Sequence, residues 1–205
     1  MVYTISGGPP MNDQMLDIWL DRLMDGDQEA FEVVYSLTRT KIYGTVAAMV
    51  SNKEDVHDIV NEIYYQLWRA LPSYDRNRPF LFWLNGIVFR QVKNWRRQIW
   101  RRFRLLERKN RLREEPHVET PDEPLLETES SQEMQRAIMA LPFKLRIVII
   151  YRYYYEYSYD QIGELLQIPS GTAKSRSHLA LKRIRAWFDT ELDGEELQQC
   201  LSPKS

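Results

Sequence analysis

An acidic, proline-containing stretch over residues 114–133 divides the chain into two parts, neither larger than one small domain. It holds three prolines and eight acidic residues, no basic residue and few apolar ones. This composition favours an extended linker, because prolines stiffen the backbone and like charges repel each other. We therefore expect two compact domains on either side of a flexible linker over residues 105–131.

Apolar residues recur with a helical period in both parts, and no segment shows the alternation of a β-strand. The clearest helix is predicted over Glu54–Leu71, which carries one apolar stripe and is followed by Pro72. Further helices are predicted over residues 11–37 (with a break at Gly26-Asp27), 41–50, 80–104, 132–141, 143–155, 159–166 and 170–188. The predicted fold is all-α, with domains over residues 12–104 and 132–189, a flexible extension over 1–11 and a tail over 190–205.

The composition argues against most common classes of enzyme. One cysteine, Cys200, allows no internal disulfide and no cysteine zinc site, and it fits the reducing cytoplasm. Three histidines and eight glycines provide neither a histidine-rich metal site nor a glycine-rich phosphate loop. No apolar run approaches the ~20 residues of a membrane-spanning helix, and no secretion signal is visible. We expect no cofactor and no metal.

The net charge of −1 conceals a strong segregation of charge along the chain. Residues 80–113 carry eleven basic side chains and one acidic side chain, whereas residues 114–133 carry eight acidic ones. Such a basic block is typical of a surface that binds a polyanion. A solvated helix face is the alternative.

Residues 158–185 show the pattern of a helix, a tight turn and a second helix. Ser158 and Gln161 match a capping box, and Ser170 is expected to cap the second helix. That helix carries basic residues and no acidic one through Ala186, as expected of a helix that enters the major groove. The residues predicted to contact duplex DNA are Ser170, Thr172, Lys174, Ser175, Arg176, His178 and Lys182.

Three large apolar residues of this helix, Leu179, Leu181 and Ile184, are expected to pack in the core. The alternative for the whole motif is an ordinary helical hairpin with a solvated basic face.

Two further helix faces in the first part of the chain carry candidate binding residues. Asp55, Asp58 and Glu62 lie on one outward face of the helix over residues 54–71, where they either dock on a basic partner or are simply solvated. Taken alone, the spacing favours solvation.

The helix over residues 80–104 is predicted to have an inward and an outward side. Its inward side carries Phe80, Leu84, Ile87, Gln91 and Trp95, with Trp83 near the edge. Its outward side carries Phe82, Phe89, Lys93, Arg96 and Trp100. Exposed aromatics between cations are typical of surfaces on which unpaired bases stack, and Tyr74 could join them. Alternatively, Phe82 or Phe89 packs against the helices of residues 11–50.

Five stretches in this order and spacing resemble the bacterial RNA polymerase sigma factors of the extracytoplasmic-function group, across residues 12–188. These stretches are Asp27–Tyr35, Glu54–Pro72, Arg78–Trp95, Ala140–Arg152 and Ser158–Arg185. The resemblance implies a non-catalytic protein of the bacterial cytoplasm that directs core RNA polymerase to promoters, often in a stress response, and helps to melt the −10 element.

The resemblance also implies roles for particular residues. Asp55, Asp58, Asn61 and Glu62 would dock on a coiled coil of the polymerase clamp, and the helix from Ser170 would read the −35 element. The residues implied in −10 binding are Tyr74, Arg76, Asn77, Arg78, Phe82, Phe89, Arg90, Lys93, Arg96, Arg97 and Trp100. The implied partners are core polymerase (clamp coiled coil and flap), promoter DNA and an anti-sigma factor, often membrane-bound, whereas the chain itself is not in the membrane.

The chain departs from the family pattern at three positions. Many relatives carry Asn where this chain has Arg90, and often Arg where it has Leu179 and Leu181. Three other functions stay open on the residues alone: a polymerase-independent helix-turn-helix regulator, a protein-interaction adaptor, and a di-metal oxidase. The oxidase would use Glu54-x-x-His57 and Glu114-x-x-His117, although Pro116 interrupts the second motif.

Overall fold

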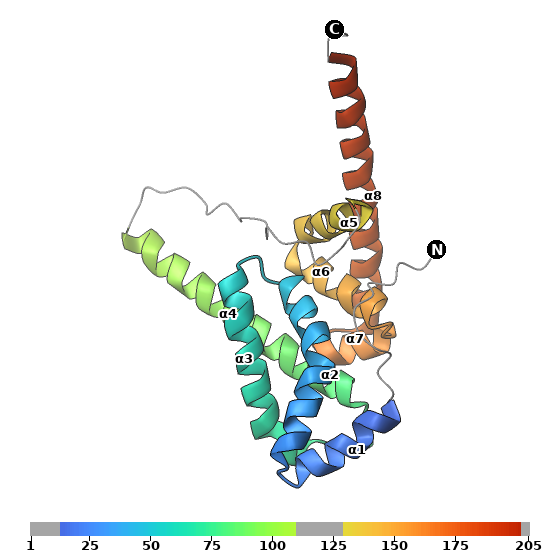
Figure 1. Ribbon diagram of the computed structural model, residues 1–205. Helices are drawn as coiled ribbons and strands as arrows, with labels where there is room; N and C mark the ends of the chain where they lie inside the picture. Colours follow the sequence, from blue (N-terminus) through green and yellow to red (C-terminus); the bar gives the residue numbers. More distant parts are fainter. Residues whose placement is uncertain (1–12, 110–128, 202–205) are drawn as a thin grey trace. The chain divides into compact units, whose positions relative to one another are not determined.

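The computed structural model describes residues 13–109 and 129–201, which form helices joined by short turns (Figure 1). The chain divides into two compact units, residues 1–123 and 124–205. The predicted all-α fold is confirmed, since these described ranges contain no strand. The extension over residues 1–11 and most of the linker predicted over 105–131 lie outside the described residues. Of the helices described, none is long and apolar enough to span a bilayer.

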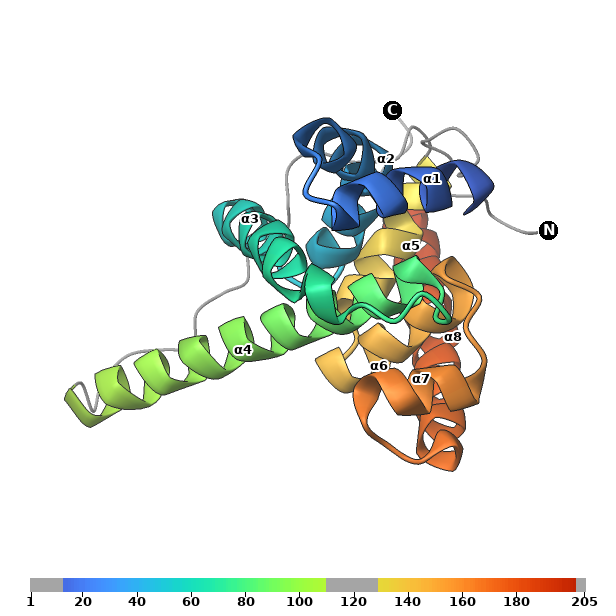
Figure 2. The same cartoon turned by 90° about the horizontal axis from the view of Figure 1, so that it is seen from below.

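The described part of the first unit, residues 13–109, consists of four α-helices and one short 3-10 turn. They are α1 (Asp13–Met24), α2 (Gln28–Ala47), α3 (Lys53–Ala70), the turn η1 (Leu71–Ser73) and α4 (Phe80–Lys109). Both α2 and α4 contact α3, and α1 lies along α2. The second half of α4 projects beyond the other three helices (Figures 1 and 2).

Helix α2 is continuous where the sequence predicts two separate helical runs. Two buried threonines stay within the helix because their hydroxyls donate to carbonyls one turn back: Thr38 to Val34 at 2.7 Å and Thr45 to Lys41 at 2.8 Å. The helix begins after Asp27, whose carboxylate accepts from the amides of Glu29 and Ala30.

A second contact joins α1 to the start of α2. The Arg22 guanidinium donates to the carboxylates of Asp27 at 2.7 Å and Glu29 at 2.6 Å. The hydrogen bond from Arg22 lowers the pKa of the Asp27 carboxyl, which keeps the cap ionised.

The apolar stripe of α3 forms the centre of the first unit. Its buried residues are Val56, Ile59, Val60, Ile63, Tyr64 and Leu67. Full burial of such an aliphatic side chain stabilises the fold by about 1.5–3 kcal/mol. The Thr38 hydroxyl donates its only proton to the Val34 carbonyl, so in the 2.9 Å contact between the two hydroxyls Tyr64 is the donor and Thr38 the acceptor. Burial raises the pKa of the Tyr64 hydroxyl.

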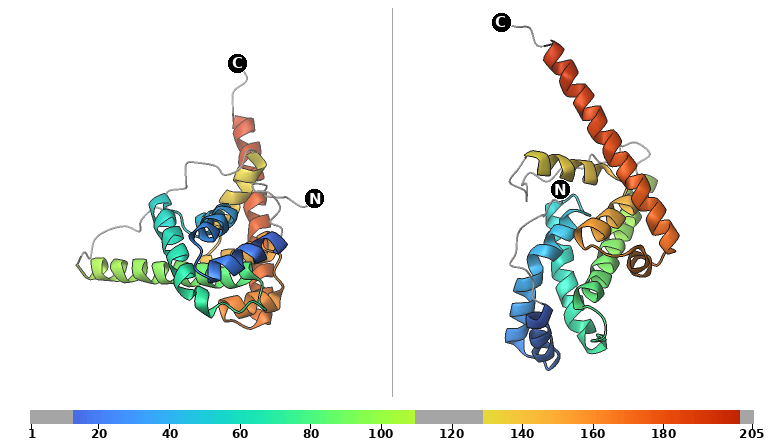
Figure 3. Two further views of the ribbon diagram at one scale, coloured as in Figure 1. Left: turned by 60° about the horizontal axis from the view of Figure 1, so that its bottom comes forward. Right: turned by 90° about the vertical axis from the view of Figure 1, so that its right-hand side faces the viewer.

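Over residues 129–201, the second unit is described as four α-helices and one π-helical turn (Figure 3). They are α5 (Glu129–Ala140), α6 (Phe143–Ile149), the turn η2 (Ile150–Tyr154), α7 (Tyr159–Leu166) and α8 (Ser170–Leu201). Helix α8 continues past Phe188, where the sequence predicts its end, and residues expected to form a tail belong to it. Residues 190–201 contain no proline and several good helix formers, so nothing in them stops the helix.

One buried apolar cluster of the second unit brings α5, α6 and α8 together. Its buried residues are Ala137, Leu141, Leu145, Ile149, Ala180 and Ile184. The Arg146 guanidinium links α5 to α6, because it donates to the carbonyls of Met139 at 2.5 Å and Leu141 at 2.9 Å. These bonds satisfy carbonyls that the end of α5 leaves open.

The turn between α7 and α8 follows the predicted motif, with one correction. The capping box is present: the Ser158 hydroxyl accepts from the Gln161 amide, and the Gln161 side chain accepts from the Ser158 amide. Ser170, however, does not cap α8. The Pro169 carbonyl accepts from Thr172 and Ala173, so Ser170 is already the first helical residue.

Gly163 lets α7 approach this turn closely, and its replacement tests the geometry. A Cβ at Gly163 would lie 2.7 Å from the backbone oxygen of Ile168, whereas a Cβ at Gly171 would meet no atom within 4 Å. We expect Gly163→Ala to destabilise the second unit by about 1–3 kcal/mol through overpacking. Gly171→Ala should be neutral or stabilising by up to about 1 kcal/mol.

Urea unfolding of the full chain, with hydrogen exchange to assign the change to residues 129–189, measures this difference. Equal stability of the two variants would contradict the close approach at Gly163.

Candidate polymerase and nucleic-acid interfaces

The acidic face of α3 is presented to solvent as the sequence predicts. Asp58, Asn61 and Glu62 are exposed and Asp55 is half-buried, because the buried stripe takes up the opposite side of the helix. Glu62 is held by Gln66, whose side-chain amide donates to its carboxylate at 2.7 Å. The structure thus brings the four predicted residues together on one face.

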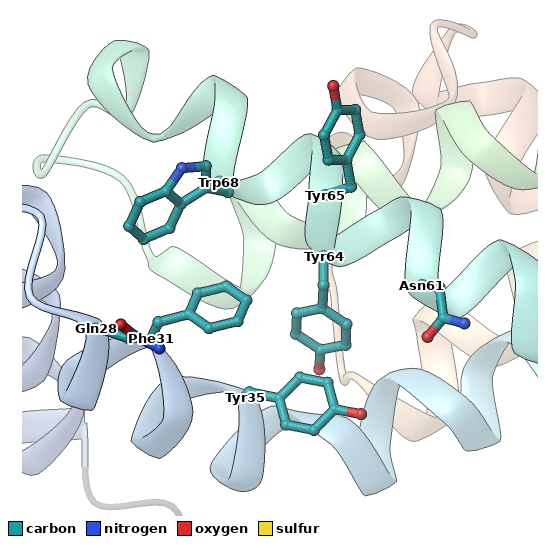
Figure 4. A pocket seen from close by; sticks show the side chains of 7 residues that line it. All are labelled: Gln28, Phe31, Tyr35, Asn61, Tyr64, Tyr65 and Trp68. Atoms are coloured by element: carbon teal, nitrogen blue, oxygen red, sulfur yellow. The ribbon is translucent and has the colours of Figure 1, made fainter.

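An aromatic groove of about 470 Å³ adjoins this face between α2 and α3 (Figure 4). It is lined by Gln28, Phe31 and Tyr35 of α2 and by Asn61, Tyr64, Tyr65 and Trp68 of α3. The Trp68 ring meets Phe31 edge-on at 5.5 Å between centroids, and Tyr35 meets Tyr64 at 4.6 Å. Asn61 belongs to both the groove and the predicted acidic face.

Sequence reasoning missed two groove residues of the α3 surface, Tyr65 and Trp68. Tyr65 is 56% exposed and Trp68 is 44% exposed. A signal was available, since Asn61, Tyr65 and Trp68 follow one another at helical spacing beside the apolar stripe. Large exposed aromatics of this kind mark a surface that another molecule covers.

The loop before α4 is more internally bonded than the sequence suggests. Tyr74, predicted to stack on a base, is buried against Phe80 and Trp83, and its hydroxyl donates to the Arg78 carbonyl at 2.7 Å. Arg76 forms an ion pair with Asp21 of α1. The predicted stacking role of Tyr74 is therefore wrong for this conformation.

Asn77 and Arg78 are exposed in the same loop. The Asn77 amides donate to the Asp75 carboxylate, which holds the turn closed.

The prediction that Phe82 and Phe89 are exposed is also wrong. They are only 8% and 9% exposed, respectively. The first half of α4 is covered by both α2 and α3, so side chains on more than one side of the helix enter the core. The alternative of packing against neighbouring helices therefore applies to both residues.

The outward stripe of α4 is basic and includes one aromatic residue. Its exposed members include Arg90, Lys93, Asn94, Arg97 and Trp100, and the exposed Arg101 and Arg104 continue it. Trp100 is 62% exposed. Arg96 is half-buried, and this burial lowers its pKa. Asn94 was not predicted, although it lies one turn from both Arg90 and Arg97.

Helix α8 presents most of the predicted contact residues. Lys174, Ser175, His178 and Lys182 are exposed, and Ser170, Thr172 and Arg176 are half-buried. Arg183 and Arg185 are exposed as well. The opposite side is buried through Ala173, Ser177, Ala180 and Ile184. The helix therefore has one basic, hydroxyl-bearing face and one core face.

Leu179 does not pack as predicted, because it is 43% exposed. Leu181 is half-buried and Ile184 is buried, so the prediction of packing holds for these two.

The described residues contain no group of three or more His, Cys, Asp or Glu side chains that could hold a metal ion. His57, from the first motif of the di-metal alternative, lies against the Tyr43 ring at 5.3 Å. Glu114 and His117 of the second motif lie outside the described residues.

Two family descriptions match the chain, one in each unit. "Sigma-70 region 2" matches residues 34–102, which include α3 and most of α4. "Sigma-70, region 4" matches residues 131–184, which include the helix-turn-helix. The two matches define the class of protein: a sigma-70-type factor of bacterial RNA polymerase.

Similarity to curated proteins narrows this class. The ECF RNA polymerase sigma-E factor of Escherichia coli (strain K12) is 30% identical over 185 residues, which cover 85% of this chain and 95% of the relative. The ECF RNA polymerase sigma factor SigW of Bacillus subtilis (strain 168) is 27% identical over 180 residues, or 84% and 96% of the two chains. The chain therefore belongs to the ECF RNA polymerase sigma factors, and the predicted resemblance is confirmed.

Solved structures share the fold. The sigma factor RpoE from Bartonella quintana, solved in complex with the anti-sigma factor NepR, has a TM-score of 0.61 at 19% identity, covering 78% of this chain and 96% of that one. CnrH, solved in complex with the cytosolic domain of CnrY, has a TM-score of 0.60 at 20% identity, covering 84% and 96%.

As a member of this family, the protein acts in promoter-specific initiation of transcription by RNA polymerase. The family is one of non-enzymatic initiation factors, and the alternative of a polymerase-independent regulator is not favoured.

Phe89 and Trp100 of α4 differ strongly in burial, and the stability of variants at the two positions tests this difference. We expect Phe89→Ala to destabilise the first unit by about 3 kcal/mol, because it removes a buried ring. Trp100→Ala should change stability by no more than about 0.5 kcal/mol, because the ring is mostly in solvent. Urea unfolding of the two full-length variants measures both values. A larger loss from Trp100→Ala than from Phe89→Ala would contradict this assignment.

Proposed function

We propose that residues 12–104 bind core polymerase and the −10 element, and that residues 132–189 bind the −35 element. Within the first of these parts, the polymerase-docking surface comprises Asp55, Asp58, Asn61 and Glu62, and its target is the clamp coiled coil. The observation that carries this assignment is that Asp58, Asn61 and Glu62 are exposed, with Asp55 half-buried, on one face of α3 beside an aromatic groove. A basic helix of the partner would complement the carboxylates.

The aromatic groove adds apolar area to this docking surface. Trp68 and Tyr65 are roughly half exposed in the free protein, so a partner that covers them gains apolar burial. Buried aromatic anchors surrounded by polar groups carry most of the free energy at protein interfaces. In this arrangement the carboxylates orient the partner, and the aromatic residues hold it.

The outward stripe of α4 binds the melted −10 strand in this proposal. Arg90, Lys93 and Arg97 follow the phosphates, and Trp100 stacks on a base. Lys93 is already placed above the Phe89 ring at 5.6 Å, which positions its ammonium near the middle of the stripe. Phe82 and Phe89 support this surface from the core and do not contact DNA.

The exposed face of α8 reads the −35 duplex in the major groove. Hydroxyls at its start and the cations Lys174, Arg176 and Lys182 are suited to phosphates and base edges. The exposed Tyr153 and Met134 of the same unit would support contact with the polymerase flap.

A protein that sequesters the free chain is a further proposed partner. RpoE and CnrH, which share the fold, were both solved with a second protein, NepR and CnrY respectively. We place this chain, with polymerase and such an anti-sigma factor, in the bacterial cytoplasm, and the anti-sigma factor is often membrane-bound in the family.

Charge reversal on α3 tests the docking surface. We expect the double variant Asp58→Lys/Glu62→Lys to weaken binding to core polymerase by roughly tenfold or more, because like charges replace a complementary pair. Biolayer interferometry with immobilised core polymerase measures the affinity. The control is Asp25→Lys, which reverses an exposed acid at the end of α1. Equal affinities for the double variant and the wild type would rule out this face.

Replacement of Trp100 tests the −10 surface. We expect Trp100→Ala to reduce promoter opening by roughly fivefold or more, since one stacked base contributes about 1–3 kcal/mol. Trp100→Phe should retain most of the opening, because it keeps an aromatic face. Permanganate reactivity of −10 thymines in the holoenzyme–promoter complex reports opening directly. Reduced promoter opening in both variants, or in neither, would contradict stacking by Trp100.

A further inference from the structure

One exposed apolar residue stands out on the basic face of α8. Leu179 is 43% exposed, and among the described side chains of α8 it is the sole large apolar one classed as exposed. At ~100° per residue it is turned about 120° away from the middle of the stripe formed by Ala173, Ala180 and Ile184. It therefore points outward, into the same space as the predicted DNA contacts.

The surroundings of Leu179 favour DNA over a protein as the molecule that covers it. Ser175 lies one turn before it, and Lys182 and Arg183 lie one turn after it. All three are exposed, and no acidic residue occurs in α8 before Asp189. An isolated leucine among hydroxyls and cations lacks the contiguous apolar patch of a protein-docking site.

We propose that Leu179 specifies thymine at one position of the upstream promoter element by contact with the C5-methyl group. This inference rests on the proposed position of α8 in the major groove. Thymine is the one base that presents a methyl group there. A leucine can neither donate nor accept a hydrogen bond, so opposite guanine or cytosine it would leave a polar edge unpaired.

The residue one turn earlier reinforces this preference. The Ser175 hydroxyl donates to the Thr172 carbonyl at 3.0 Å, so its proton is already used within the helix. Its oxygen can still accept a hydrogen bond from an adenine or cytosine amino group. Neither Leu179 nor Ser175, arranged in this way, donates to the O6 and N7 acceptors of guanine.

The test compares thymine with deoxyuridine, which pairs identically but lacks the methyl group. The first step is a selection: holoenzyme, reconstituted from core polymerase and the full chain, binds a library randomised over the upstream element of a chain-dependent promoter. We expect one position to be enriched in thymine. Replacing that thymine with deoxyuridine should weaken wild-type holoenzyme binding by about fourfold, the effect of one lost methyl contact.

Variants of Leu179 test whether this side chain causes the preference for thymine. Leu179→Ala should bind the thymine and deoxyuridine promoters equally, and Leu179→Met should keep the preference because it preserves apolar contact. Deoxyuridine at a thymine outside the upstream element is the matched DNA control.

Three outcomes would overturn the inference, each in a distinguishable way. If wild-type holoenzyme is indifferent to deoxyuridine, Leu179 reads no methyl group, although α8 can still bind DNA. If Leu179→Ala changes affinity for core polymerase but not base preference, the residue contacts protein. If no upstream base is enriched and Lys174→Glu has no effect on binding, the proposed −35 role of α8 fails as well.

Discussion

The burial of one side of α3 between α2 and α4 is the constraint on which the rest of the first unit depends. Once its apolar stripe is covered, the carboxylates of Asp58 and Glu62 have only the opposite side available, and they face solvent. The same packing brings aromatic rings of α2 and α3 together in the groove and encloses the first half of α4. One packing arrangement thus exposes the acidic face of α3 beside the aromatic groove and directs the basic stripe of α4 outward.

In helix α8 of the second unit, too, the burial of one side leaves the opposite side exposed. Its small buried residues, Ala173, Ser177 and Ala180, let it lie close to the preceding helices. Gly163 allows the tight turn that sets the direction of α8. The polar and basic residues then occupy the exposed side, with Leu179 among them. Promoter recognition by two separate units fits this design, because each unit exposes a different chemistry: an aromatic–basic stripe on α4 and a basic, hydroxyl-bearing face on α8.

Periodicity and local chemistry were sufficient to predict the all-α fold, the capping box at Ser158 and the acidic face of α3, because these depend on neighbours along the helix. Phe82 and Phe89 could not be assigned in this way. A helical wheel shows which residues share a side, but it does not show how many helices cover α4. The ion pair of Arg76 could not be predicted either, since its partner Asp21 lies in α1, far away in the sequence. The opposite error occurs at Leu179: its apolar side chain predicts burial in the core, but the structure leaves it exposed.

Sequencing of the transcripts that purified bacterial core polymerase makes on fragmented genomic DNA, with and without the chain, tests whether the chain directs polymerase to promoters through two separate DNA-binding surfaces. If it does, discrete chain-dependent start sites appear, and their upstream DNA shares two sequence elements at a nearly constant separation. No chain-dependent start sites, or start sites that share only one element, would contradict this role.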